Sequence, residues 1–478
     1  MPKFTGREHE LAELDRLYRK GGFQLVVLYG RRRVGKTTLA FHFAEGKPTL
    51  SFTAKVQSDA LNLADFSSAL LDRFGMPTGT TFASWDAAFS FLAKSAGDCQ
   101  LVFIFDEFPY AATKNSSLIS SLQIAVDREL ANTNVFLILT GSNQGFMEEK
   151  VLGLTGSPSA ERALGAKNPL FGRRTAQIHL EPFGYRDAAR MLSGIEPEQL
   201  VTYYACFGGT PYYLAMIDEG DSFEENVTRL FFTKEGLLYE EPSMLLRQEL
   251  REPALYSSIL AAISQGATKP QAISDVVGEE RTSVMRYLMT LRSMGLVERS
   301  VPFGEDPERS RRGLYRLKEP CFSFWYRFVR PVLDSVERDA GELEARDLLV
   351  SQELPAYVGH WFESICLEWL VAAAKADKLP LSPTRFGQWW GTNPRAKSQD
   401  DIDVVAGNPR TKDLLIGECK WRMSFDETKA LAKLRDRIGL VSGYERTNLA
   451  VFSRHPVSEA TRQKAPDTLF VSTKDLYA

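Results

Sequence analysis

The chain has 478 residues, which is too long for one ordinary hydrophobic core and indicates about three domains. Its 44% hydrophobic and 25% charged residues are typical of a soluble globular protein, and the net charge of −3 excludes a protein that is basic overall, although not a local basic face. No apolar run approaches the ~20 residues that a membrane span needs, and the N-terminus shows no apolar signal region. The five scattered cysteines favour reduced thiols and a cytoplasmic location.

The first 180 residues alternate helical stretches with short apolar strands. Helical spacing runs through GREHELAELDRLYRK, the strand FQLVVLY follows, and TTLAFHFAEG resumes a helix. Further strands are predicted over residues 49–55, 101–110 and 134–143. This alternation predicts an α/β fold with a parallel sheet that helices cover on both faces.

Residues Gly30 to Thr37 fit the phosphate-binding pattern G-x-x-x-x-G-K-[ST] without a mismatch, between a strand and a helix. The glycines let backbone N–H groups wrap the phosphates, and the helix N-terminus adds its positive end. Lys36 would reach the β- and γ-phosphates, and the Thr37 hydroxyl would ligate Mg²⁺. We therefore expect ATP and Mg²⁺ as cofactors, with nucleotide contacts from Gly30, Arg33, Val34, Gly35, Lys36, Thr37 and Thr38.

Two acids end the apolar strand FIFDE, about 70 residues after this loop. Asp106 is placed to hold Mg²⁺ through water, and Glu107 to polarise the attacking water. The alternative is a pair of exposed acids at the end of a strand. The phosphate-binding loop upstream favours the Mg²⁺ and water roles over this alternative. Ser142, with Asn143, follows the next strand and would either sense the γ-phosphate or cap its own loop.

Gly- and Pro-containing residues 153–172 predict a long loop, and helical patterns from about 180 to 245 predict a small lid. Three arginines, Arg162, Arg173 and Arg174, lie in or just after the loop. One of them could act on a neighbouring subunit's ATP, but ordinary surface charge is the interpretation that we favour.

Residues 254–318 change character. Three short helical segments precede two strand-like segments, which is the order of a winged helix. The expected recognition helix spans Glu280 to Met294, with Arg281, Thr282, Ser283, Arg286 and Tyr287 near its first half. Residues 281–330 hold eleven Lys or Arg against five Asp or Glu, a local charge of +6. The predicted wing loop adds Arg309, Arg311 and Arg312, so we expect DNA contact here. A protein-contact role is the alternative.

A second group of charged residues lies near the C-terminus, in the predicted strands DIDVVA and LLIGECKW. Alternation would put Asp401 and Asp403 on one face, with Ile402 and Val404 on the other. Asp403, Glu418 and Lys420 would then meet on the paired strands. Two carboxylates can hold a divalent cation, which could promote phosphodiester hydrolysis. Glu363, on a predicted helix, is a further candidate ligand, and a surface salt bridge is the alternative.

The chain resembles archaeal and bacterial ATPases of the AAA+/STAND clade. The motifs FTGREHELAEL, FDEFPY, LTGSN, FGRRTAQIHLEPF and GGTPYYL carry this resemblance. It implies that a winged helix and a nuclease-like domain follow the ATPase module. It also implies that Arg7 approaches the adenine and that Gly209, Thr210 and Pro211 close on the nucleotide. Asn143 departs from the small hydroxyl residue that is common in these relatives.

The C-terminal pattern resembles that of the PD-(D/E)-x-K nucleases. This resemblance makes Asp403 the first metal acid, and Glu418 with Lys420 the E-x-K pair. It places Asp401 where some relatives have a second acid, and matches Glu363 to the helix acid before the core.

We therefore predict four parts: an ATPase core at 1–180, a helical lid at 181–245, a winged helix at 246–335 and a nuclease-like domain at 336–478. The predicted function is ATP hydrolysis coupled to DNA binding, with a Mg²⁺-dependent nuclease site gated by ATP. A nucleotide-gated DNA-binding switch with an inactive nuclease-like domain is the alternative, and a protein-remodelling ATPase is a third option. No membrane partner is expected, and a homo-oligomer is possible.

Overall fold

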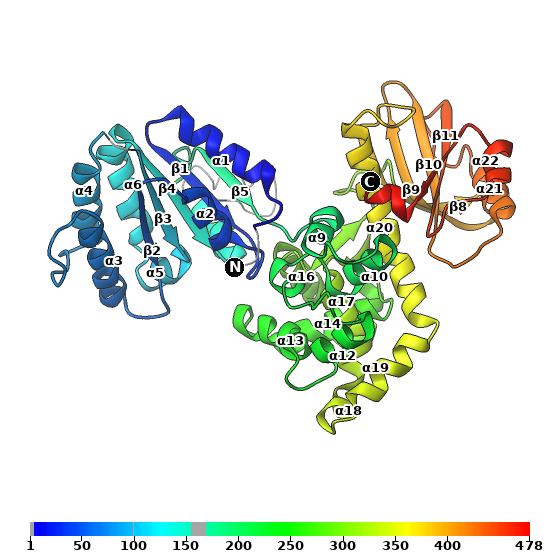
Figure 1. Ribbon diagram of the computed structural model, residues 1–478, viewed down its shortest axis with the longest axis horizontal. Helices are drawn as coiled ribbons and strands as arrows, with labels where there is room; N and C mark the ends of the chain where they lie inside the picture. The colour runs from blue at the N-terminus through cyan, green and yellow to red at the C-terminus, as the bar shows by residue number, and fades with distance from the viewer. Residues whose placement is uncertain (1–3, 99, 154–168) are drawn as a thin grey trace. The chain divides into compact units, whose positions relative to one another are not determined.

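The apolar strands of the N-terminal segment pair into one parallel sheet in the computed structural model (Figure 1). The structure describes residues 4–98, 100–153 and 169–478, and the chain divides into two compact units between Pro182 and Phe183. The sheet of the first unit has the order β2-β3-β4-β1-β5, and every neighbouring pair is parallel. Its strands are β1 Gln24–Tyr29, β2 Thr49–Thr53, β3 Leu101–Asp106, β4 Val135–Gly141 and β5 Ala176–His179.

Helices cover both faces of this sheet, as the alternating pattern predicted. Every residue of β1, β3 and β4 is buried, because successive side chains enter the cores on opposite faces. Val26 and Leu28 pack on one face, while Leu25 and Val27 pack on the other. The first face carries α1 Glu8–Lys20 and α2 Lys36–Ala44; the second carries α3 Asp59–Arg73, α4 Trp85–Ser95, α5 Phe108–Lys114 and α6 Leu118–Arg128. The predicted α/β fold is confirmed.

The second unit begins with helices that share one apolar core. These are α9 Tyr185–Met191, α10 Pro197–Phe207, α11 Pro211–Leu214, α12 Phe223–Phe231 and α13 Leu237–Glu249. The next segment has three helices followed by two antiparallel strands, in the order that the sequence predicted. They are α14 Pro253–Ser264, α15 Pro270–Val277, α16 Arg281–Ser293, β6 Val297–Ser300 and β7 Leu314–Leu317. We call β6, β7 and the residues between them the hairpin.

A long helix and a mixed sheet complete the second unit. After α17 Pro320–Phe324, α18 Leu333–Glu337 and α19 Gly341–Val350, the helix α20 Glu353–Lys375 packs on the sheet. The strand order is β12-β11-β10-β9-β8. The strands are β8 Arg385–Asn393, β9 Ser398–Asn408, β10 Asp413–Lys420, β11 Arg446–Ser453 and β12 Thr468–Ser472, with α21 Glu427–Asp436 and α22 Glu459–Lys464 between the later ones. The strands DIDVVA and LLIGECKW, which the sequence predicted, are β9 and β10, whereas β8 and β12 were missed.

A β-bulge corrects the predicted faces of β9. The pairing shifts between Gly387 and Trp389, so that Gly387 lies opposite Val405 and Trp389 opposite Ile402. Two residues of β9 therefore face one residue of β8, which breaks the alternation. Ile402 and Val404, expected on one face, belong to the cores on opposite faces of the sheet.

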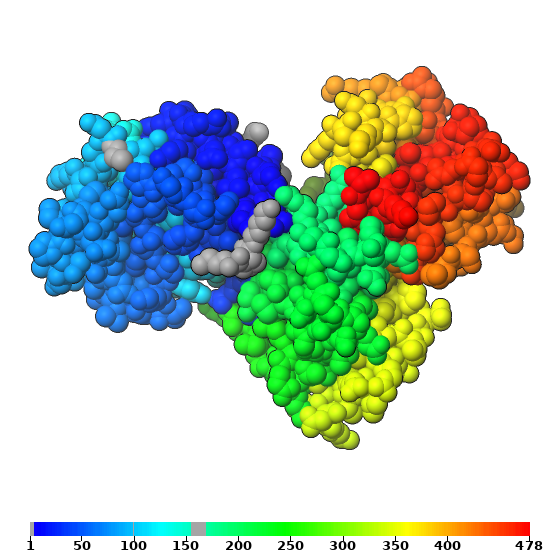
Figure 2. All heavy atoms as spheres, in the orientation of Figure 1, coloured from blue at the N-terminus to red at the C-terminus, as the bar shows by residue number. Residues whose placement is uncertain are grey.

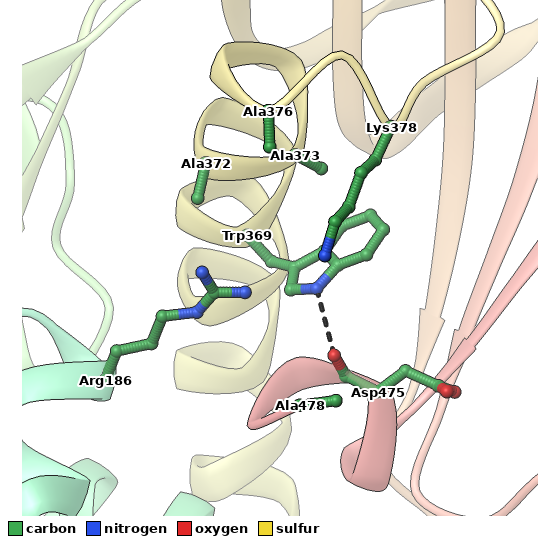
Figure 3. Close-up of a pocket in the computed structure, with 8 residues that line it drawn as sticks. All are labelled: Arg186, Trp369, Ala372, Ala373, Ala376, Lys378, Asp475 and Ala478. Atoms are coloured by element: carbon green, nitrogen blue, oxygen red, sulfur yellow. Dashed lines mark hydrogen bonds between the residues drawn. The ribbon is translucent and has the colours of Figure 1, made fainter.

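The last helix, α23 Thr473–Leu476, returns to the start of the second unit. The Tyr185 hydroxyl donates to the carbonyl oxygen of Leu476 at 2.9 Å. Figure 3 shows the second bond, from the Trp369 indole to the carbonyl oxygen of Asp475 at 3.2 Å. In the space-filling view the red C-terminal residues lie directly against the green helical segment (Figure 2). Arg186 and Lys378 flank a hollow of about 230 Å³ beside Trp369. The helical segment and the C-terminal sheet are thus joined by buried contacts.

Candidate functional site

The phosphate-binding loop joins the end of β1 to the start of α2, at the carboxyl edge of the parallel sheet. Gly30 has φ +150°, and a Cβ there would lie 2.2 Å from the carbonyl oxygen of Leu180, so no larger residue fits. The Lys36 ammonium is buried and donates to the carbonyl oxygens of Gly30 at 3.0 Å and Arg31 at 2.7 Å. The lysine of the motif therefore points into the loop that would surround the phosphates.

Thr37 and Asp106, which were both predicted to hold Mg²⁺, are in contact. The Thr37 hydroxyl lies 3.1 Å and 3.2 Å from the two carboxylate oxygens of Asp106. The hydroxyls of Thr140 and Thr53 donate to the same carboxylate, Thr53 at 3.5 Å. A hydroxyl beside a carboxylate is a set of hard oxygen donors, which fits Mg²⁺. Sequence reasoning missed Thr53 and Thr140, although Thr140 stands in the LTGSN motif.

Glu107 has an unusual backbone and a firmly held side chain. Its φ of +51° and ψ of 42° lie in the left-handed region, where residues with a Cβ are strained. Its backbone N–H donates to the Thr140 hydroxyl at 3.1 Å. Its carboxylate accepts from the Ser142 hydroxyl at 2.8 Å and from the Ser142 N–H at 3.2 Å. Ser142 therefore holds the acid that was predicted to polarise water, a contact that neither interpretation of Ser142 anticipated.

Arg7 lies beside the same loop. It is buried, and its guanidinium donates to the carbonyl oxygens of Val34 at 3.1 Å and Glu181 at 2.6 Å. Arg7 thereby joins the loop to the residues that follow β5. Asn143 caps α7 Gln144–Phe146, with its side chain accepting from the Phe146 N–H at 2.9 Å.

In the C-terminal sheet, Glu418 is buried among cations. One carboxylate oxygen pairs with Lys420 and lies 3.8 Å from Lys433, and the other pairs with Arg437. Burial by itself would raise the pKa of Glu418, but Lys420, Arg437 and Lys433 outweigh it and hold that pKa below its ordinary value. Arg437, only 1% exposed, also donates to Asp400 at 2.9 Å. The sequence pattern contained no signal for Arg437 or Asp400.

Asp403 and Glu363 form a second part of this region. The Asp403 carboxylate accepts from the Cys419 N–H at 2.7 Å, and the Glu363 carboxylate accepts from the Gln388 amide at 2.8 Å. Burial raises the pKa of both acids, and each also faces negative charge: Asp403 from Glu418, and Glu363 from Asp403. A divalent cation bound between these acids would reduce the repulsion between their negative charges. Within the described ranges, no group of three or more His, Cys, Asp or Glu side chains is arranged to hold a metal ion.

Some residues of the predicted DNA-binding segment are exposed, whereas others are hydrogen-bonded within the protein. Arg281, Thr282 and Arg286 of α16 are exposed, and so are Arg309 and Arg311 of the hairpin. Two other predicted contacts are engaged elsewhere. Tyr287 is buried and donates to Glu252 at 2.8 Å, while Arg312 donates to Glu305 at 2.8 Å and to the carbonyl oxygen of Trp390 at 3.1 Å. The prediction for Tyr287 is therefore wrong, because packing takes its ring into the core.

Comparison with known proteins gives matches for both ends of the chain. Residues 4–217 match the family described as an ATPase domain predominantly from Archaea. The N-terminal part of this chain is therefore similar to that family, and it has the fold of P-loop ATPases. Residues 325–431 match a family described as archaeal and bacterial proteins of unknown function.

Two relatives and one solved structure are similar to different lengths of the chain. An uncharacterized protein of Methanocaldococcus jannaschii is 29% identical over 425 residues, which cover 88% of each chain. An uncharacterized ATP-binding protein of the same organism is 48% identical over 44 residues, 9% of this chain and 75% of that protein. The fold is similar to that of a Walker-type ATPase of Pyrococcus abyssi, with a TM-score of 0.50 and 20% identity over 68% of this chain and 96% of the other.

The remaining predicted residues belong to one or the other of the two units. Arg173 pairs with Asp127, and Arg174 donates to the carbonyl oxygen of Leu152 at 2.7 Å. Arg162 lies outside the described residues. Pro211 begins α11, in the second unit.

Among the described residues, no helix is long and apolar enough to cross a membrane.

Proposed function

We propose that the ATPase domain binds and hydrolyses ATP. The contact between Thr37 and Asp106, next to Glu107, is the observation that carries this proposal. Lys36 would exchange its contacts with the loop carbonyls for the β- and γ-phosphates. Mg²⁺, held through Thr37 and Asp106, would offset the charge of the phosphate oxygens. The backbone N–H groups of the loop, with Arg33, Val34, Gly35 and Thr38, complete the proposed nucleotide site, and Arg7, which precedes α1, lines it.

Glu107 is the proposed general base. In the state described here its carboxylate is hydrogen-bonded to the hydroxyl and the backbone N–H of Ser142, so the oxygen that accepts these bonds is directed at Ser142 and not at water. The γ-phosphate of bound ATP would compete for the Ser142 hydroxyl and so release Glu107 toward water. Ser142 would thereby couple nucleotide binding to the position of the Glu107 carboxylate. In the second unit, Gly209, Thr210 and Pro211 are the proposed lid contact.

We propose further that α14, α15, α16 and the hairpin are a winged helix that binds DNA. The exposed Arg281 and Arg286 of α16, with Arg309 and Arg311 of the hairpin, supply positive charge that phosphates attract. Arg312 would act differently, since it ties the hairpin to β8.

The C-terminal sheet is the proposed site of Mg²⁺-dependent phosphodiester cleavage. Asp403 and Glu418 are the proposed ligands, with Glu363 as a further acid behind them, because carboxylate oxygens are the donors that a hard cation prefers. A cation bound there would stabilise the negative charge that develops on the phosphate. Lys420, released from Glu418 as that carboxylate turned to a cation, would orient the attacking water. ATP turnover would gate access of DNA to this site, in a protein that we propose to be cytoplasmic and able to form homo-oligomers.

One experiment separates this function from its rival. Linear, nicked, single-stranded and branched DNA would be incubated with the protein and Mg²⁺ or Mn²⁺, with and without ATP, and compared with Lys420→Ala. Cleavage that disappears in the variant supports the nuclease site, and a dependence on ATP supports gating.

The rival is a nucleotide-gated DNA-binding switch with an inactive C-terminal site. The ion pairs that Glu418 makes with Lys420 and Arg437 favour it, because a carboxylate held by two cations is less available to a metal ion. Intact ATP hydrolysis and DNA binding, without cleavage of any substrate, would select this rival.

A further inference from the structure

A cavity of about 240 Å³ lies where the hairpin meets helix α20 and strand β8. All three elements belong to the second unit, and each contributes polar or aromatic side chains to the walls. Its lining includes Ser300 and Arg316 of the hairpin, His360 and Ser364 of α20, and Gln388 and Trp390 of β8.

The cavity is built by contacts that fix the hairpin to the sheet. The Phe303 N–H donates to the carbonyl oxygen of Gln388 at 2.7 Å, and the buried Phe303 ring joins the core of the C-terminal sheet. The Arg316 guanidinium donates to the Gln388 side-chain oxygen at 2.7 Å. Together with the bond from Arg312 to Trp390, these contacts set the walls before any ligand arrives.

The lining suits a flat aromatic ring with a phosphate attached. The Arg316 guanidinium lies 5.9 Å from the centre of the Trp390 ring, which places a cation beside an aromatic face. The imidazole of the exposed His360 and the hydroxyls of Ser300 and Ser364 supply hydrogen-bonding groups at the edge. Bases of single-stranded nucleic acid stack on such aromatic faces, while arginines follow the backbone. The volume is below the roughly 300–1,000 Å³ of pockets for drug-sized ligands, so it admits one base and not a base pair.

The cavity also lies next to the proposed cleavage site. Gln388, which accepts from Arg316 inside the cavity, donates its amide to Glu363 at 2.8 Å. A single side chain therefore separates the cavity from an acid of the proposed metal set. A nucleotide in the cavity would leave its neighbouring phosphodiester close to those acids.

We propose that this cavity takes one unpaired nucleotide of a DNA strand, with its base against Trp390 and its phosphate toward Arg316. The proposal rests on the proposed DNA-cleaving function and adds its substrate class: DNA with an unpaired segment, such as a flap, a fork or a single strand. An uninterrupted duplex would have no base to place there.

Filling the cavity tests the proposal. In Ser364→Trp an exposed residue of α20 would place an indole in the cavity, while in Ala356→Trp an exposed residue two turns earlier on the same helix would not. The full chain, in EDTA so that no cleavage occurs, would be titrated into a labelled single-stranded oligonucleotide and into a matched duplex. We expect Ser364→Trp to weaken single-strand binding about tenfold or more, the range of one lost base stack, with duplex binding unchanged. Ala356→Trp should bind both as the wild type does.

A second measurement tests the proposal if the Ser364→Trp protein fails to fold, which lost ATP hydrolysis would indicate. A 2-aminopurine base in the single strand should change its fluorescence on binding to the wild type and much less on binding to Trp390→Ala. Equal single-strand affinity of Ser364→Trp and the wild type would overturn the cavity proposal alone. A wild type that binds duplex but no single strand would also overturn only this proposal. A wild type that binds neither would overturn the proposed DNA function as well.

Discussion

Arg437 offers the most stringent test of the C-terminal site, because the structure buries it completely between acids. It is 1% exposed, and it contacts Glu418, itself 2% exposed, as well as Asp400 at 2.9 Å. Arg437→Leu would leave the Glu418 carboxylate in the core with Lys420 and the distant Lys433. Breaking a buried ion pair by removing one partner typically costs ~3–5 kcal/mol. The free energy of opening the sheet should fall by about this amount.

Hydrogen exchange measured by mass spectrometry would follow the backbone amides of β9, β10 and α21 separately from the ATPase domain. Glu418→Gln added to Arg437→Leu should recover much of the loss, because an amide has no charge to bury. Lys433→Ala is the control, since an exposed partner at 3.8 Å should change stability by less than ~1 kcal/mol. A loss below ~1 kcal/mol in Arg437→Leu would contradict this prediction and would mean that Glu418 is solvated or neutral in the native protein.

Three further predictions concern the nucleotide and DNA sites. Lys36→Ala should abolish tight ATP binding, since the ammonium that the loop holds is lost as a phosphate partner; calorimetry that finds unchanged affinity would reject the phosphate-binding assignment. Glu107→Gln should bind ATP with near wild-type affinity and hydrolyse it ~10²-fold or more slowly, as judged by phosphate release, and normal turnover would move the base elsewhere. Arg309→Ala with Arg311→Ala should weaken DNA binding and reduce the slope of log affinity against log salt by up to ~2, whereas Arg312→Ala should act through hairpin stability; an unchanged slope in the double variant would mean that the loop does not touch phosphate.

The parts of the fold that sequence predicted are those with strong local patterns. β1, β3 and β4 are uninterrupted apolar runs, and their full burial between two helical layers is what such runs indicate. β5 and β8 were missed in the residue patterns. Four residues of mixed polarity make β5, and β8 holds two glycines and a glutamine. Their strand form comes from the neighbours with which they pair rather than from their own composition.

The candidate sites divide in the same way. Lys36, Thr37 and Asp106 could be predicted, because a fixed motif and a strand end bring them together in this fold. Arg437 could not, since it contacts Glu418 and Asp400 only after β9, β10 and α21 have packed. The bulge in β9 could not be predicted either, because it is a feature of the pairing between β9 and β8 and not of the sequence of one strand.

The hydrogen bond between Tyr185 and Leu476 joins the first helix of the second unit to its last helix. The two residues are 291 positions apart in sequence, yet one hydrogen bond joins them, and Arg186 donates to the same carbonyl oxygen at 3.3 Å. α9 is the first helix after the boundary at Pro182, so a strain applied there has a short route to the end of the C-terminal sheet. That route does not pass through the hairpin. A force applied to the chain at Pro182 would therefore act on both the first and the last helix of the second unit.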